Sequence, residues 1–242
     1  MKRTERRHLK ENELQTFARQ LTEAYGEHQR ETTAVIALVA VAAVAAIGFF
    51  AWRQNVEAKA HVLLAEAVAV QGARVGPATA PGQTDQGGLH FATERERAQT
   101  ALTKFKVSAD AYPSTDAGIY SRYQQAATYM TLGDGAGAAA AYQQVIDKDG
   151  DGIYGQMARL GLAEAQASLG RYEEAITAFQ VMAQRKDGPL PIDAILMQLG
   201  RTYVEAGKPA EAQQTFNRLV QEFPESPFGA DARRELDNLK KT

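Results

Sequence analysis

The sequence predicts an all-α protein in which one transmembrane helix is followed by a solenoid of short helical hairpins. Two patterns support this prediction: an uncharged run over residues 32–52, and residue columns that recur every 37 positions beyond it. The composition also argues against several kinds of functional site. The 242 residues contain 27 Lys and Arg against 29 Asp and Glu and no Cys, which argues against a nucleic-acid surface, a disulfide framework and a zinc–thiolate site.

The N-terminal segment, residues 1–31, is polar and carries one apolar stripe. Leu14, Phe17, Leu21 and Tyr25 are three or four positions apart, which is the spacing of one face of a helix. An amphipathic helix of this kind could lie on the inner leaflet of a membrane, pack on a partner, or be only marginally stable. The sequence leaves these three interpretations open.

Residues 32–52 are the predicted transmembrane helix. These 21 residues carry no charge, and a helix of that length is roughly 31 Å long, enough to cross the hydrocarbon core of a bilayer. Phe49, Phe50 and Trp52 gather at one end, where aromatic rings favour the headgroup layer. The alternatives are a buried core helix and a cleaved signal peptide, and the long polar segment upstream argues against the signal peptide.

The Lys and Arg residues around this helix predict its orientation. Residues 1–31 contain seven of them, and the 31 residues that follow the helix contain three. Basic residues tend to stay on the cytoplasmic side of a membrane. We therefore expect a single-pass protein with a cytoplasmic N-terminus and with residues 53–242 on the far side, which in a bacterium is the periplasm.

A repeat of 37 residues dominates the rest of the chain. Each unit is expected to form a helix, a glycine-centred turn and a second helix, and to end at a helix-terminating residue. A small Ala would let the two helices approach, an aromatic ring would fill the space between them, and Gly would adopt the positive φ of a helix C-terminus. No segment has the pattern of a strand. The four columns are Ala101, Ala138, Ala175 and Ala212; Phe105, Tyr142, Phe179 and Phe216; Gly133, Gly170 and Gly207; and Pro113, Gly150, Asp187 and Pro224.

The last unit carries a family resemblance. The spacing of a tetratricopeptide repeat is matched by Leu196, Leu199, Gly200, Tyr203, Gly207, Pro209, Ala212, Phe216 and Pro224. Residues 53–242 therefore resemble a tetratricopeptide-repeat domain, an α-solenoid in which stacked hairpins bury a continuous core. The expected boundaries are a split first repeat at 53–113 with a loop at 75–92, repeats at about 119–150, 156–187 and 193–224, and a capping helix at 228–240.

The chain as a whole resembles bacterial membrane-anchored tetratricopeptide proteins of the ancillary Sec-translocon-subunit type. The resemblance rests on the FFAWRQ sequence at residues 49–54, on VLLA at 62–65 and on the repeat columns. It implies an inner-membrane scaffold or adaptor whose periplasmic repeats bind the Sec translocon, periplasmic chaperones, or other membrane and secretory-pathway proteins. The alternative is an envelope-complex or cell-division assembly protein that forms a homo-oligomer through its repeats.

The repeat columns also predict a binding surface. Tetratricopeptide arrays bind on the face formed by their first helices, and Tyr and Met side chains there suit an apolar or helical segment of another protein. The principal residues expected on this face are Tyr120, Tyr123, Met130, Met157, Leu160, Glu164, Met197 and Arg201, with Ala127, Ala167, Ala194 and Val204 beside them. The alternative is that these side chains pack against the long first helix or the capping helix.

No catalytic or metal-binding constellation is predicted. Asp147, Asp149 and Asp151 match the start of a calcium loop, but Ala158 stands where a bidentate Glu would close the coordination shell. A turn between two repeats is therefore the preferred interpretation. The four His residues lie far apart, and no nucleophile has a base beside it. We expect a protein that is not an enzyme, with no cofactor, no metal and no nucleic-acid partner.

Overall fold

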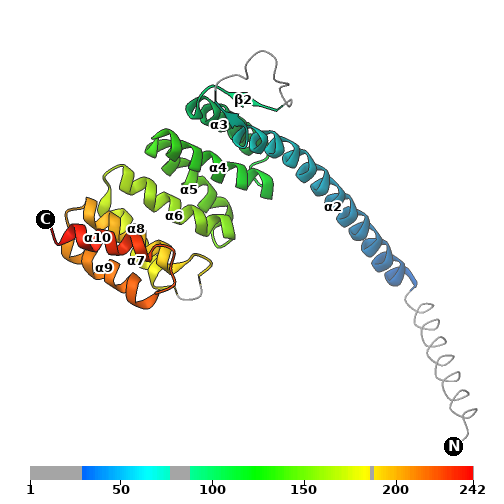
Figure 1. The fold of residues 1–242 in the computed structure, drawn as a ribbon. Helices are drawn as coiled ribbons and strands as arrows, with labels where there is room; N and C mark the ends of the chain where they lie inside the picture. The colour runs from blue at the N-terminus through cyan, green and yellow to red at the C-terminus, as the bar shows by residue number, and fades with distance from the viewer. Residues whose placement is uncertain (1–28, 77–87, 186–187, 242) are drawn as a thin grey trace, which may run out of the picture. The chain divides into compact units, whose positions relative to one another are not determined.

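The computed structural model describes residues 29–76, 88–185 and 188–241 (Figure 1). Within these ranges the protein is helical apart from two short strands, so the predicted all-α solenoid is confirmed. The elements are α2 (Gln29–Gln71), β1 (Arg74–Val75), β2 (His90–Phe91), α3 (Glu94–Ala111), α4 (Asp116–Leu132), α5 (Gly135–Asp149), α6 (Ile153–Ser168), α7 (Tyr172–Ala183), α8 (Ile192–Glu205), α9 (Pro209–Glu222) and α10 (Gly229–Leu239). The chain divides into two compact units, Met1–Asn55 and Val56–Thr242.

In the first unit, α2 exposes the large apolar side chains of the predicted membrane segment. From Val35 to Trp52 these side chains are each 54–71% exposed. The Phe49 ring lies 6.0 Å from that of Phe50 and 6.1 Å from that of Trp52, so the aromatic residues gather at one end as predicted. By length and composition this helix is a candidate membrane span. The apolar stripe predicted before it lies outside the described residues.

In the second unit, the end of α2 packs against α3. Ala67 and Val70 of α2 form a small core with Ala101 and Phe105 of α3. The repeat columns had assigned Ala101 to close helix packing and Phe105 to filling the space between the helices, and both are buried there. Residues of the two helices therefore meet in the manner of a hairpin, although a long segment separates them in sequence.

The expectation of no strands is wrong at one point. β1 and β2 form a parallel pair in which Arg74 is opposite His90 and Val75 is opposite Phe91. The pair joins the two ends of the segment expected to be a plain loop between α2 and α3. Two-residue strands are shorter than any alternating pattern, so hydrophobic periodicity could not reveal them.

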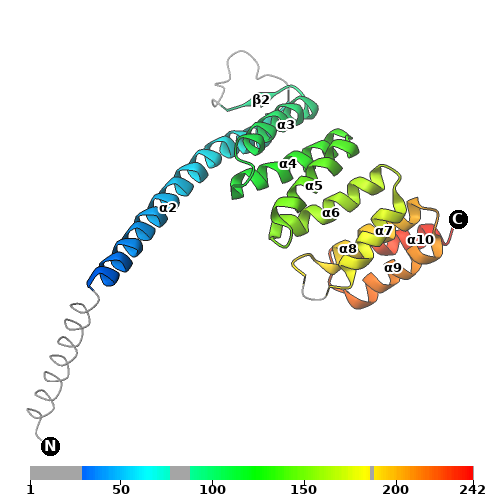
Figure 2. The ribbon, with the colours of Figure 1, turned by 180° about the vertical axis from the view of Figure 1, so that it is seen from behind.

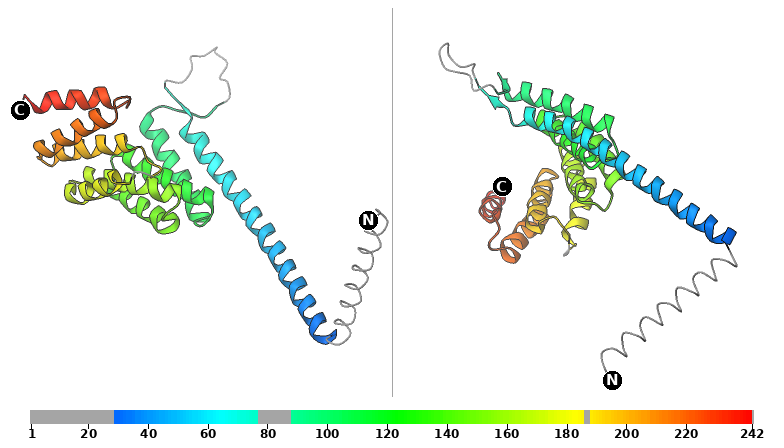
Figure 3. Two further views of the ribbon diagram at one scale, coloured as in Figure 1. Left: turned by 90° about the horizontal axis from the view of Figure 1, so that it is seen from below. Right: turned by 90° about the vertical axis from the view of Figure 1, so that its right-hand side faces the viewer.

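Three helical hairpins follow, α4–α5, α6–α7 and α8–α9, and α10 packs on the last of them (Figures 1 and 2). Figure 3 shows the same succession from two other directions. The glycine after each first helix has the predicted positive φ, 81° at Gly133, 74° at Gly170 and 71° at Gly207. The next residue's amide donates a 2.9 Å bond to the carbonyl five residues earlier in all three turns, which closes the helix ends.

The predicted helix-terminating residues stand at the ends of the second helices. α3, α5 and α9 end one or two residues before Pro113, Gly150 and Pro224, respectively. The fourth member of this column, Asp187, lies outside the described residues. α7 ends at Ala183, before that position is reached.

The Ala and aromatic columns form the core of the hairpins. All eight members are buried: Ala101, Ala138, Ala175, Ala212, Phe105, Tyr142, Phe179 and Phe216. In the last hairpin the Phe216 ring packs on the backbone of Gly200, where an added Cβ would lie 2.3 Å from a ring carbon. The close approach of α8 and α9 therefore requires glycine at this position.

Candidate functional site

The candidate site is the face formed by the first helices, α4, α6 and α8, each of which contacts the next. Seven of the eight principal residues predicted on this face keep part of their surface exposed: Tyr120, Tyr123, Met130, Met157, Leu160, Glu164 and Arg201. Of the four smaller residues, Val204 is exposed, and the three alanines are partly exposed. This exposure leaves the side chains accessible to a partner, and binding at this face stays a prediction.

Four tyrosine rings meet between α4, α5 and α6, and we call them the tyrosine cluster: Tyr120, Tyr123, Tyr142 and Tyr154. The ring centroids of Tyr120 and Tyr154 are 5.3 Å apart, those of Tyr123 and Tyr142 are 5.7 Å apart, and those of Tyr123 and Tyr154 are 6.5 Å apart. Tyr142 is 4% exposed and the other three are partly exposed. The cluster therefore presents aromatic surface on a buried aromatic base.

The base of the cluster depends on a glycine in α6. The Tyr142 ring, from α5, lies so close to the backbone of Gly161 that an added Cβ would be 2.3 Å from a ring carbon. A side chain at position 161 would occupy the volume of the ring. The ring of one hairpin thus packs directly on the first helix of the next hairpin.

The hydroxyls of Tyr123, Tyr142 and Tyr154 stay protonated at neutral pH. Burial raises the pKa of the Tyr123, Tyr142 and Tyr154 hydroxyls above the ordinary value, and the negative charge of Glu164 raises the first two further. A neutral phenol can donate as well as accept a hydrogen bond. Tyr123 and Tyr154, which are partly exposed, therefore combine apolar surface with hydroxyls that can bond to a bound peptide.

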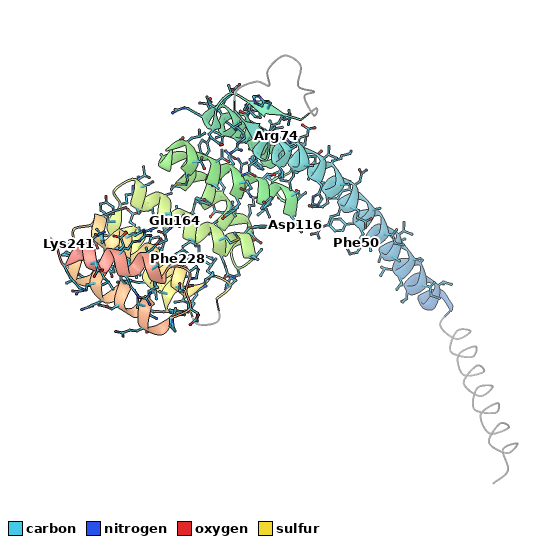
Figure 4. The ribbon with its side chains drawn as sticks, in the orientation of Figure 1. Phe50, Arg74, Asp116, Glu164, Phe228 and Lys241 are labelled. Atoms are coloured by element: carbon cyan, nitrogen blue, oxygen red, sulfur yellow. The ribbon has the colours of Figure 1, made fainter. Side chains whose placement is uncertain are left out.

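Glu164 lies in the second half of α6 and is the acidic residue predicted on this face (Figure 4). Its Oε1 accepts a 2.8 Å hydrogen bond from Nε2 of Gln198 on α8. Burial raises the pKa of its carboxyl above the ordinary value, and the bond from Gln198 only partly opposes this. No Lys, Arg or His among the described residues pairs with it.

Two predicted site residues make contacts within the protein, one in the core and one at the surface. Met197 is 1% exposed and belongs to the core of the last hairpins, so its placement on an accessible surface was wrong. Arg201 lies 3.8 Å from Asp231 and 4.0 Å from Glu235, both on α10. Met197 is covered because several helices meet in that core. Arg201 faces carboxylates of α10, the capping helix that the alternative interpretation named.

Sequence reasoning missed Tyr154 and Gln198 as members of this face. Tyr154 stands 37 residues after Ala117 and 37 before Pro191, so no repeat column marks it. Gln198 stands 37 residues before Glu235, and Glu164 stands 37 before Arg201. The pair Glu164 and Gln198 thus recurs in the sequence as Arg201 and Glu235. Only the structure shows that the members of each pair lie close together.

The acidic turn before α6 has a structural role. A carboxylate oxygen of Asp149 accepts backbone hydrogen bonds from Tyr154 at 3.0 Å and from Gly155 at 3.1 Å. These are donors that the N-terminus of a helix leaves free. The interpretation of this acidic sequence as a turn between repeats is confirmed.

Comparison with known proteins identifies the repeats. One tetratricopeptide-repeat family model matches residues 123–189, and a second matches residues 194–226. No curated protein matches the sequence.

Solved structures agree on the fold. Two crystal structures of a Podospora anserina protein assigned as a kinesin light chain, with nearly identical tetratricopeptide-like repeats, match at 18% identity. The TM-scores are 0.51 and 0.50, and the matches cover 61% of this chain and 79% and 80% of those chains. PilF from Pseudomonas aeruginosa matches at 18% identity and a TM-score of 0.48, over 60% of this chain and 61% of that one. At 18% identity, the similarity to the two Podospora anserina structures shows a shared fold and nothing about function.

Proposed function

We propose that this chain, which carries tetratricopeptide repeats between residues 123 and 226, is a membrane-anchored adaptor that binds other proteins on the face of α4, α6 and α8. Tetratricopeptide repeats imply a protein-interaction scaffold. The observation that carries the proposal is the partly exposed tyrosine cluster beside Glu164. Accessible tyrosine surface is typical of protein-binding sites.

The membrane anchor is proposed from α2. Its apolar side chains between Val35 and Trp52 are exposed in the first unit, and a bilayer is the environment that would bury them. The excess of Lys and Arg in residues 1–31 supports a cytoplasmic N-terminus and a periplasmic repeat domain. The protein would then cross the bacterial inner membrane once.

The partners are proposed from the resemblance of the chain to ancillary subunits of the Sec translocon. The Sec translocon, periplasmic chaperones and clients emerging from the translocon are the proposed ligands. The role is non-catalytic, since the repeats offer a binding face rather than a nucleophile with its base.

Topology is tested by cell fractionation and by alkaline phosphatase fused after residue 242. Alkaline phosphatase is active only when exported, so an active fusion in the membrane fraction is expected. An inactive fusion, or recovery of the protein in the soluble fraction, would contradict the anchor and its orientation.

The binding face is tested by photo-crosslinking in intact membranes. Benzoylphenylalanine placed at Tyr120 is expected to crosslink to translocon or chaperone proteins identified by mass spectrometry. The matched control is the same probe at Gln214, an exposed position on α9. Equal crosslinking from both positions would contradict the proposed face, and self-linked dimers as the main product would favour an assembly protein instead.

A further inference from the structure

Glu164 carries a negative charge that the described part of the protein does not neutralise. Its hydrogen-bond partner is the neutral amide of Gln198, and its charge acts on two neutral phenols, those of Tyr123 and Tyr142. The other charged position in the same repeat column differs. Arg201, 37 residues later, lies within 4.0 Å of both Asp231 and Glu235 on α10.

Packing gives no reason for a charge at position 164. A glutamine there could accept the same bond from Gln198 with its amide oxygen. The carboxylate instead loses hydration on folding, which is why its pKa is raised. A partly desolvated charge without a counter-charge lowers the stability of the folded protein when no partner is bound. A cation from a partner would offset that loss.

The neighbouring aromatic surface also favours binding of a positively charged group. Carboxylates raise the pKa of three phenols in the cluster: Glu164 acts on Tyr123 and Tyr142, and Asp116 and Asp149 act on Tyr154. The faces of tyrosine rings themselves attract cations. Figure 4 shows Asp116 at the start of α4 and Glu164 on α6.

We propose that Glu164 and the tyrosine cluster bind a basic side chain, Lys or Arg, carried by a segment of the protein partner. The basic group would pair with the Glu164 carboxylate while the adjoining part of the segment lies on the rings of Tyr123 and Tyr154. This inference rests on the proposed function, because it names the chemistry of the ligand for the same face.

The test is selection of random linear peptides displayed on phage against the full chain in detergent micelles. Wild type is expected to enrich peptides with Lys or Arg at one position. Glu164→Gln should lose that preference and Glu164→Lys should reverse it toward Asp and Glu. The matched control is Glu211→Gln, which changes an exposed carboxylate on α9 and should select as wild type does. Circular dichroism confirms that each variant is folded.

A double-mutant cycle on one selected peptide gives the sharper measurement. Glu164→Gln should weaken binding about tenfold, the scale of one partly buried charge pair. Replacing the basic residue of the peptide by Gln should weaken it similarly, and both changes together should weaken it no further. Independent, multiplicative losses would overturn the inference.

The remaining outcomes separate this inference from the proposed function. Peptides whose binding is lost in Tyr120→Ala, but which show no basic preference, would overturn the inference and leave the proposed binding face intact. If no selected peptide depends on either Tyr120 or Glu164, the binding face and the basic-residue inference both fail.

Discussion

The α6–α8 junction and the α8–α10 junction differ in whether a charged side chain has an oppositely charged neighbour. Between α6 and α8, Glu164 accepts a hydrogen bond from the neutral amide of Gln198, and no basic side chain of the described residues pairs with it. Between α8 and α10, the equivalent Arg201 lies near Asp231 and Glu235. The interior junction keeps a charge available for another molecule, whereas the terminal junction is closed by the chain itself. The same repeat position therefore has the proposed binding role at Glu164, whereas at Arg201 it contacts the helix that ends the array.

The glycine–aromatic contacts of the two regions differ as well. Phe216 packs on Gly200 of its own hairpin, and Tyr142 packs on Gly161 of the following hairpin. Phe216 is fully buried, whereas the Tyr142 ring also contacts Tyr123 of the partly exposed cluster. The first contact is enclosed by core on all sides, and the second borders the candidate site.

The largest effect is expected from removing the enclosed ring. Phe216→Ala should lower the free energy of unfolding by about 3–5 kcal/mol, because it removes a fully buried ring and leaves a cavity. Tyr142→Ala should lower it less, since that ring borders exposed surface. Urea denaturation of the full chain in detergent, followed by circular dichroism, measures both. A greater loss for Tyr142→Ala would overturn the distinction between the two contacts.

Adding a methyl group at the two glycines tests the same distinction from the other side. Gly200→Ala should lower the free energy of unfolding by about 1–3 kcal/mol, because the Phe216 ring has nowhere to move. Gly161→Ala should have a smaller effect on stability, because the Tyr142 ring can shift toward the cluster. The shift would disturb the partly exposed rings, so Gly161→Ala should still weaken peptide binding. Equal stability losses would show that both sites are equally enclosed.

A smaller effect of opposite sign is expected at Glu164. Because its pKa is raised in the folded state, the folded protein holds this proton to higher pH than the unfolded chain. The charged form therefore lowers stability at neutral pH, and protonation relieves this as pH falls through the raised pKa. The groups facing the carboxyl are Gln198, Tyr123 and Tyr142, which stay neutral over this range.

Glu164→Gln should accordingly be more stable than wild type at neutral pH, and the difference should shrink in acid. Thermal unfolding measured across a pH series checks this. If Glu164→Gln is less stable than wild type at neutral pH, the carboxylate has an internal stabilising contact, and the argument for an external cation weakens.

The smallest effect is expected at the terminal junction. Arg201→Ala should change the free energy of unfolding by only about 0–1 kcal/mol, because Arg201 is exposed and its ion pairs are screened by water. It should leave selection of basic peptides unchanged, because its carboxylate partners belong to α10. A loss of basic-peptide binding in Arg201→Ala would mean that the binding face extends to the end of the array.

Local features could be predicted because each depends on a few neighbouring residues. The positive φ of Gly133, Gly170 and Gly207 follows from sterics at one helix end. The buried Ala and aromatic columns follow from a spacing that places them on one side of a helix. The apolar run that makes α2 a candidate membrane span is readable without any fold.

The errors occurred where distant segments meet. Met197 has the spacing of an accessible face, but it lies in the core that the last helices form together. The pairing of β1 with β2 joins residues on either side of a long segment, and neither strand has a pattern of its own. Tyr154 joins the candidate site because α6 brings it beside α4, and no column of the repeat records that contact.

The sequence by itself determined the helical hairpins, their glycine turns and the residues of their cores, because these depend on short-range sterics and on a fixed period. Tertiary structure decided which residues of the first helices remain accessible, because accessibility depends on which helix lies next in the stack. It also decided that Arg201 lies near two carboxylates and that Glu164 has no basic partner in the described part of the chain, since charge compensation is a property of neighbours in space.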